Sequence, residues 1–247
     1  PLIRGPLRSR TLPDVLQEAR WLASEGVKEL ILVAQDITAF GDDRGQNETA
    51  ALLDALQQVN GIVWIRLLYA YPERVTDDFI AAMARNSKVL PYLDLPIQHI
   101  NSDILRAMNR KGDRNTVLGA IRRLRAALPG LTLRTTLIAG YPGETQAQFD
   151  ELCEFVKEMR FDRLGCFAYS QEEDTPAAKL PQLPLELREE RAAQIMQIQS
   201  RILSEQQAAL QGSVLTVLCD GLDDESGLYA CRTAGAATEI YTVVYVK

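Results

Sequence analysis

The chain has 247 residues, of which 47% are hydrophobic and 24% are charged, a composition typical of a soluble globular protein with one large core. Its net charge of −6 argues against broad binding to a phosphate backbone, and no apolar run is long enough to cross a bilayer. The four cysteines are widely separated, with no Cys-x-x-Cys motif and a single histidine, so no metal or cluster ligand set is readable. We therefore expect a cytoplasmic protein with reduced thiols.

The first 180 residues alternate between buried strand patterns and amphipathic helix patterns. The opening stretch is basic, lacks an initiating methionine and is expected to be a loop cut from a longer protein. Thr11 is the expected N-cap of the first helix, and Thr76 that of the third. Strands are predicted at 27–34, 62–70, 92–99, 131–139 and 163–170, and helices at 13–26, 49–59, 75–84, 101–109, 115–128 and 144–159. This alternation predicts a parallel sheet, either open or closed into a barrel, with its ligand site at the carboxyl ends of the strands.

The pattern changes after Ser170. A linker at 181–184 precedes a long helix at 185–210, and short alternating strands follow at 214–218, 227–231 and 240–246. Acidic residues outnumber basic ones in this last part, which suits a basic protein partner better than a nucleic acid; a merely solvated acidic surface is the alternative. We divide the chain into a barrel-like core (1–180), a linker with the long helix (181–211) and a β domain (212–247).

Polar side chains follow each predicted strand at its carboxyl end. Taken singly, most of these residues would more often be turn residues than ligand contacts. The alternative for Arg134 is a pair with a neighbouring carboxylate, and the alternative for His99 is a structural role. Together, with one group per successive strand, they indicate a ligand site. The members are Gln35, Asp36, Tyr69, Tyr71, Gln98, His99, Arg134, Thr136, Tyr169 and Ser170.

Three segments carry a resemblance to a known family. They are Val33-Ala-Gln-Asp-Ile-Thr-Ala-Phe-Gly41, Pro96-Ile-Gln-His-Ile-Asn-Ser-Asp-Ile-Leu-Arg-Ala-Met108 and Arg134-Thr-Thr-Leu-Ile-Ala-Gly-Tyr-Pro-Gly-Glu-Thr145. The chain resembles the radical S-adenosylmethionine (SAM) methylthiotransferases over nearly its whole length. Further stretches at 3–10, 66–72, 95–99 and 167–170 are similar to the branch of that family that modifies a ribosomal protein.

The resemblance implies a partial TIM-type (β/α)6 radical SAM barrel whose first strand is missing, followed by a small all-β TRAM (OB-like) domain. It also implies two 4Fe-4S clusters, neither of them liganded by this fragment. The Cys-x-x-x-Cys-x-x-Cys loop that holds the SAM-cleaving cluster would lie just upstream of Pro1, and a further domain with the second cluster would precede it. The fragment is therefore expected to be inactive alone, with no metal ligands and no catalytic residue of its own.

The resemblance also implies residue roles in binding SAM. Gln35 and Asp36 occupy the place of the methionine-amine contact, although the common Gly-Gly-Glu form is absent. The remaining roles fall to Gln98, His99, Arg134 and Thr136 at the ribose or carboxylate, Ile138 and Ala139 at the adenine, Tyr169 and Ser170 closing the site, and Tyr69 and Tyr71 facing the substrate.

The implied reaction adds a methylthio group to the β-carbon of an aspartate in the twelfth small-subunit ribosomal protein. Its expected partners are that protein, bound through the acidic β domain, a sulfur donor and an electron donor; a nucleic acid or a membrane is not expected. A tRNA adenosine methylthiotransferase is the alternative within the family. A cluster-free α/β barrel acting as a binding module is the alternative from another class.

Overall fold

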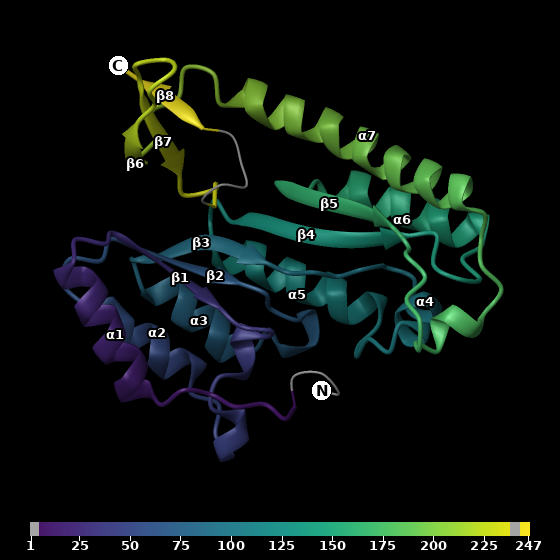
Figure 1. The fold of residues 1–247 in the computed structure, drawn as a ribbon, viewed down its shortest axis with the longest axis horizontal. Coiled ribbons are helices and arrows are strands. Elements are labelled where there is room, and N and C mark those ends of the chain that lie inside the picture. The colour runs from purple at the N-terminus through teal and green to yellow at the C-terminus, as the bar shows by residue number, and fades with distance from the viewer. Residues whose placement is uncertain (1–4, 238–242) are drawn as a thin grey trace.

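A computed structural model of the chain describes residues 5–237 and 243–247. Five parallel strands form one sheet in the order β1-β2-β3-β4-β5, and helices flank it (Figure 1). The strands are β1 (Glu29–Val33), β2 (Trp64–Leu68), β3 (Val89–Asp94), β4 (Thr132–Ala139) and β5 (Arg163–Ala168). The helices are α1 (Leu12–Ser24), α2 (Thr49–Gln57), α3 (Asp77–Arg85), α4 (Ser102–Ala107), α5 (Arg114–Ala127), α6 (Gln146–Met159) and α7 (Leu185–Ala209).

The strand order settles the choice between an open doubly wound sheet and a barrel. Successive strands are neighbours throughout, without the reversal of order that marks a doubly wound sheet. In β4, Leu133, Thr135, Leu137 and Ala139 are buried against the main core, whereas the alternate residues are partly exposed. The sheet therefore has a helix-covered outer face and an open inner face, as in a partial barrel.

Local signals place most of the helix starts where the sequence predicts them. Thr11 accepts a hydrogen bond from the Asp14 backbone N–H, and Thr76 accepts one from that of Phe79, which confirms both predicted N-caps. Helix α6 begins with a capping box, in which the Thr145 hydroxyl accepts from the Gln148 N–H and the Gln148 side chain accepts from the Thr145 N–H.

We expect Thr145→Ala to lower the free energy of unfolding by about 1 kcal/mol, because the Gln148 N–H at the start of α6 loses its side-chain acceptor. Urea denaturation checks the value. Thr145→Ser keeps the hydroxyl and should stay within about 0.5 kcal/mol of the parent chain. Equal losses for both variants would contradict the capping role.

Most predicted strands have somewhat different bounds in the structure, and two of them show why. The strand predicted at 92–99 spans Val89–Asp94, because Pro96 has no N–H to continue the ladder. The strand predicted at 214–218 is β6 (Val217–Leu222), and the Val214 side chain is almost fully exposed. β7 (Tyr229–Thr233) and β8 (Val244–Val246) complete an antiparallel sheet; residues 240–242 of the strand predicted at 240–246 lie outside the described residues.

The long helix α7 packs on the barrel instead of spanning freely from it. Ile195 and Ile202 are buried in the main core, and the buried Gln199 side chain donates a 2.9 Å hydrogen bond to the Phe161 carbonyl before β5. Figure 1 shows α7 running along β5 and α6. No helix in the described ranges has both the length and the apolar character needed to cross a membrane.

The small sheet β6-β7-β8 is attached at the amino ends of the barrel strands through buried charges (Figure 1). Glu29 at the start of β1 accepts hydrogen bonds from Arg66 of β2 at 2.7 Å and from Arg232 of β7 at 2.5 Å. Arg66, fully buried, also donates to the Ala234 carbonyl at 2.7 Å. Arg232 pairs in addition with Asp220 of β6. The antiparallel sheet is thus joined to the end of the barrel opposite the expected ligand site.

Candidate functional site

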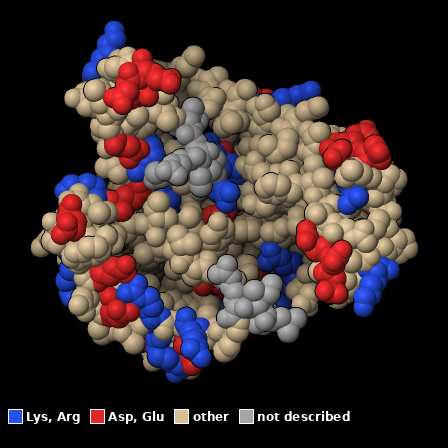
Figure 2. All heavy atoms as spheres, viewed as in Figure 1, with Lys and Arg blue, Asp and Glu red and all other residues tan. Residues whose placement is uncertain are grey.

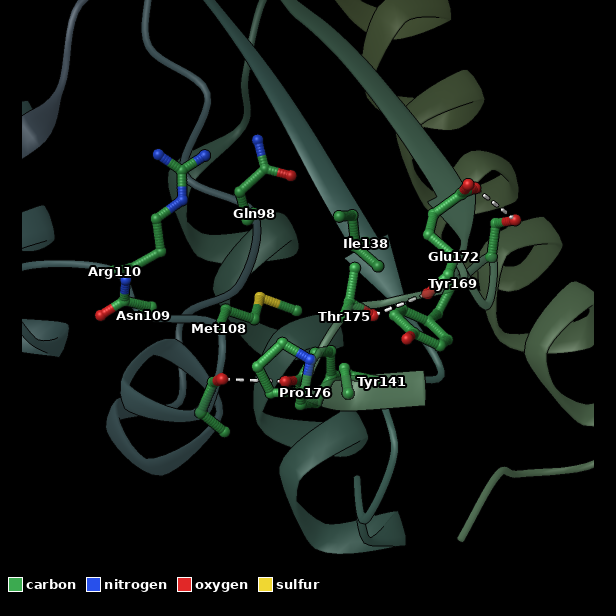
Figure 3. A pocket seen from close by; sticks show the side chains of 13 residues that line it. Gln98, Met108, Asn109, Arg110, Ile138, Tyr141, Tyr169, Glu172, Thr175 and Pro176 are labelled. Atoms are coloured by element: carbon green, nitrogen blue, oxygen red, sulfur yellow. Dashed lines mark hydrogen bonds between the residues drawn. The ribbon is translucent and has the colours of Figure 1, made fainter. Parts of the chain in front are cut away.

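A cavity of about 490 Å³ opens at the carboxyl ends of β3, β4 and β5 (Figure 3). Its volume lies within the usual range for sites that bind small molecules. Its wall consists of Gln98, Ala107, Met108, Asn109, Arg110, Ile138, Tyr141, Tyr169, Ser170, Glu172, Thr175, Pro176 and Ala177. The cavity is therefore where the parallel sheet predicts a ligand site.

Four of the predicted site residues line this cavity: Gln98, Ile138, Tyr169 and Ser170. Gln98 has a left-handed backbone, with φ 74°. It is fixed to β4, because its N–H donates to the Thr136 carbonyl at 2.9 Å and its carbonyl accepts from the Ile138 N–H at 2.8 Å. A non-glycine residue in this conformation is unusual and must be held there by its neighbours. β4 thus positions Gln98 at the cavity wall.

Two tyrosines form an aromatic corner of the cavity. The Tyr141 and Tyr169 rings meet edge to face, with their centroids 5.3 Å apart. The Tyr141 hydroxyl donates to the Ala107 carbonyl at 2.8 Å, and burial raises the pKa of that hydroxyl. The Tyr141 hydroxyl is thereby fixed, and the two rings form an apolar surface of the cavity beside Ile138.

Gln35, Asp36 and Tyr69 follow β1 and β2 and do not line this cavity. Gln35 is exposed, whereas Asp36 caps a short 3-10 helix (Ile37–Ala39) and lies 2.8 Å from the Arg74 guanidinium. Tyr69 has φ 65°, and its carbonyl accepts from the Ile37 N–H. These residues lie at the same end of the sheet as the cavity, with the Asp36 carboxylate already engaged by the protein.

Arg134 and Thr136 lie on the inner face of β4. The Arg134 guanidinium donates to the Asp94 carboxylate of β3 at 2.6 Å, and the Asp94 side chain is fully buried. Burial raises the pKa of Asp94, although Arg134 acts in the opposite direction. The structure thus shows the carboxylate pairing that was the alternative to a ligand contact for Arg134. Its predicted contact with SAM stays a prediction.

His99 and Ala139 point into the protein core and not into the cavity: each has 0% exposure. His99 Nδ1 accepts a hydrogen bond from the Asn101 N–H at 2.9 Å, so a neutral His99 carries its proton on Nε2. Nε2 lies 3.3 Å from Glu144 Oε2. The sequence shows no carboxylate partner for His99, because Glu144 is far from it along the chain.

Glu144 is the centre of a buried network that the sequence reasoning missed. Its carboxylate accepts from the Gly140 N–H at 3.1 Å and from Arg191 of α7 at 2.7 Å. Arg191 also donates to the Glu144 carbonyl. Gly140, at φ 78°, has no room for a side chain, because an added Cβ would lie 2.5 Å from the Arg188 side chain. The network therefore fixes the turn that carries Tyr141 at the cavity wall.

Arg110 is the second feature that sequence reasoning missed. Its guanidinium stacks 5.2 Å from the centre of the Tyr71 ring, and within residues 5–237 and 243–247 no acidic side chain pairs with it. The preceding Asn109 has a left-handed backbone with φ 56°. A stacked guanidinium keeps its in-plane N–H donors free for an anion such as a carboxylate. Arg110 lies in the polar segment between the helices predicted at 101–109 and 115–128, and that segment is the sequence signal that could have located it.

A metal site is not apparent in the described ranges, where no group of three or more His, Cys, Asp or Glu side chains is arranged to hold an ion. Cys153, Cys166, Cys219 and Cys231 are all free thiols. The chemistry that this part of the chain offers is recognition of a small molecule with an apolar ring and a carboxylate.

The partial barrel and its cavity belong to a known class. The profile of the Radical SAM superfamily matches residues 2–156, and the chain belongs to that superfamily. Solved structures agree on the fold: coproporphyrinogen III oxidase (HemN) from Escherichia coli has a TM-score of 0.54 at 18% identity, over 78% of this chain and 46% of that one. Elp3 from Methanocaldococcus infernus has a TM-score of 0.52 at 17% identity, over 75% and 49%.

Within the superfamily, curated relatives with higher identity are ribosomal protein uS12 methylthiotransferases (RimO). The protein from Desulfitobacterium hafniense is 47% identical over 249 aligned residues, covering all of this chain and 56% of the relative. The protein from Thermosynechococcus vestitus is 45% identical over 249, with the same coverage. The chain thus spans a little over half the length of the curated relatives it matches.

Proposed function

We propose that this chain is the barrel and C-terminal part of a ribosomal protein uS12 methylthiotransferase. The observation that carries the proposal is the 47% identity to the Desulfitobacterium hafniense protein across the whole chain. The reaction would place a methylthio group on the β-carbon of an aspartate of uS12. The comparisons do not favour a tRNA methylthiotransferase or a cluster-free binding module.

The cavity at the carboxyl ends of β3–β5 fits SAM chemically. The edge-to-face pair of Tyr141 and Tyr169 beside Ile138 suits a flat heterocycle. Arg110, which has no acidic partner among the residues that the structure describes, suits the methionine carboxylate. Gln98 offers an amide between these two ends of the wall. We propose that SAM lies across this cavity with its adenine toward the tyrosines.

The cofactor, when reduced at a 4Fe-4S cluster, supplies radical chemistry. The chain's own residues would bind and orient it and exclude water. We infer that Gln35 and Thr136 line the approach from the inner face and that Tyr69 and Tyr71 face the substrate. Tyr71 would also hold the Arg110 guanidinium in its orientation, because the two groups stack. Ser170 donates a 3.0 Å hydrogen bond to Glu172 and would hold the loop that closes the cavity.

The cysteines that hold both clusters are proposed to lie upstream of Pro1, in the part of the relatives that this chain does not span. The present residues would then complete the cofactor site without providing iron ligands. A sulfur donor and an electron donor are further partners that the complete reaction requires.

The acidic small sheet is the proposed contact for the substrate protein. Figure 2 shows acidic side chains gathered over this sheet, at the upper left. Asp224 and Glu225 are exposed in the turn between β6 and β7, and Asp223 accepts a 3.0 Å hydrogen bond from the Ser226 N–H, which shapes that turn. An exposed acidic turn attracts a basic protein and repels a nucleic acid.

The experiment that tests the proposal uses the chain extended through its upstream region, reconstituted anaerobically with iron and sulfide. We expect uptake of iron, 5′-deoxyadenosine formation with dithionite, and a methylthio mass increase on uS12 but not on tRNA. Modification of tRNA alone would transfer the proposal to the other branch of the family. A folded protein that neither takes up iron nor cleaves SAM would overturn it.

A further inference from the structure

Two of the four cysteines lie directly opposite each other in the small sheet. Cys219 of β6 is the register partner of Cys231 of β7, and the two strands are antiparallel. Directly opposed residues have Cα atoms about 4.5–5.5 Å apart, inside the range of about 4.4–6.8 Å that a disulfide spans. Their side chains also point to the same face of the sheet. The backbone is therefore arranged for a cross-strand disulfide between two thiols that are free in this structure.

The two thiols differ in access to solvent. Cys219 is exposed on β6, which is an edge strand, whereas Cys231 is buried on the central strand β7. Burial and the neighbouring Cys219 thiol raise the pKa of Cys231. A small oxidant from solution would therefore meet Cys219 first, with Cys231 already in place behind it.

The other two cysteines provide an internal contrast. Burial raises the pKa of Cys153 to about 11 and that of Cys166 to about 12, so both remain thiols at neutral pH. The register partner of Cys166 is Leu137, and Cys153 lies in the buried face of α6. Neither has the exposure and the opposed partner that Cys219 has.

We propose that Cys219 and Cys231 are a redox site that forms a reversible disulfide by exchange with a small disulfide of the glutathione class. The Cys219 thiolate attacks one sulfur of the oxidant, and the first small thiolate leaves and takes up a proton. Cys231, after losing its proton, attacks the Cys219 sulfur and displaces the second small thiol. The two cysteines lose two electrons, the small disulfide gains them, and no other reactant is needed.

The bond would act on the junction between the small sheet and the barrel. Asp220 and Arg232 directly follow the two cysteines, pair with each other, and connect to Glu29 of β1. The ladder has a register shift between Cys219 and Gly221, so the regular pairing of the two strands is interrupted beside the cysteines. The disulfide would fix β6 to β7 at this irregularity and hold the Asp220–Arg232 pair in place. This inference does not depend on the proposed enzymatic function.

The test incubates the reduced 247-residue chain with oxidised glutathione and measures its intact mass, peptide map and thermal unfolding. We expect a mass loss of about 2 Da, a peptide linking residues 219 and 231, and a monomer whose unfolding midpoint rises by several degrees; dithiothreitol should reverse all three. Cys166→Ala should retain the reaction, and Cys231→Ser should stop at a stable glutathione adduct on Cys219.

Three outcomes would overturn the inference. The first is a persistent glutathione adduct on Cys219 in the parent chain, which would mean that Cys231 cannot reach it. The second is a dimer linked through Cys219. The third is the absence of any thiol loss when a folded chain meets excess oxidised glutathione.

Discussion

Replacing Arg110 by alanine in the cluster-loaded enzyme should weaken SAM binding by about 10- to 100-fold, the equivalent of a hydrogen-bonded charge contact of about 1.5–3 kcal/mol. The guanidinium lies at the cavity wall, stacks on Tyr71, and has no acidic partner in the part of the chain that the structure describes. Because the substitution breaks no ion pair among the described residues, the folded protein should keep its stability. Isothermal titration calorimetry measures the affinity.

Further variants show how much of the affinity comes from the charge of Arg110 and how much from the planar shape of its guanidinium. Arg110→Lys keeps the charge but loses the planar fork, and should recover only part of the affinity. Tyr71→Phe keeps the ring and should bind SAM with the affinity of the parent. Tyr71→Ala should also weaken SAM binding, but less than Arg110→Ala does.

The same variant tells which carboxylate Arg110 holds. A loss confined to the SAM dissociation constant identifies the methionine carboxylate, whereas an unchanged dissociation constant with a raised KM for uS12 identifies the substrate aspartate. If neither quantity changes in a folded, iron-loaded protein, Arg110 does not bind a carboxylate in this cavity.

Periodicity placed Gln98 and Tyr169 at one edge of the sheet because parallel strands bring their carboxyl ends together, and the family resemblance added Ile138. The same rule could not show that His99 turns into the core, since the strand ends at Asp94 and the chain continues irregularly through Pro96. Arg110 belongs to no strand. Its place in the cavity depends on the left-handed Asn109, a conformation that a local sequence pattern does not specify.

Charge pairs between distant segments were also beyond sequence reasoning. Glu29 and Arg232 are separated by 203 positions, and Glu144 and Arg191 by 47. In each case a charged side chain is buried because its partner arrives from another element, so its polarity suggests a surface position until the fold is known. The long helix shows the same limit: its apolar stripe was visible, but the strand and helix that cover it were not.

The buried network around Glu144 should give the largest effect on stability. We expect Arg191→Met to lower the free energy of unfolding by about 3–5 kcal/mol, because it leaves the Glu144 carboxylate buried without its guanidinium. His99, with Nε2 3.3 Å from Glu144 Oε2, cannot replace the two hydrogen bonds that Arg191 donates to Glu144. Urea denaturation measures the change.

An exposed ion pair serves as the matched control. Arg160 and Glu205 are also joined at 2.7 Å, but their side chains are 48% and 63% exposed, so Arg160→Met should cost less than about 1 kcal/mol. The double variant Glu144→Leu with Arg191→Met removes both buried charges and should be more stable than Arg191→Met alone. If Arg191→Met lowers the free energy of unfolding no more than Arg160→Met does, the buried Glu144 carboxylate does not depend on Arg191.

The network also connects stability to the site. The Glu144 carboxylate accepts from the Gly140 N–H, and Tyr141 follows in the cavity wall, so a shift of this turn moves the aromatic corner. Arg191→Met should therefore weaken SAM binding at temperatures where the chain is still folded. The expected loss is smaller than for Arg110→Ala, because the ligand contacts remain and only their position changes. An unaltered affinity in a destabilised Arg191→Met enzyme would restrict the network to a purely structural role.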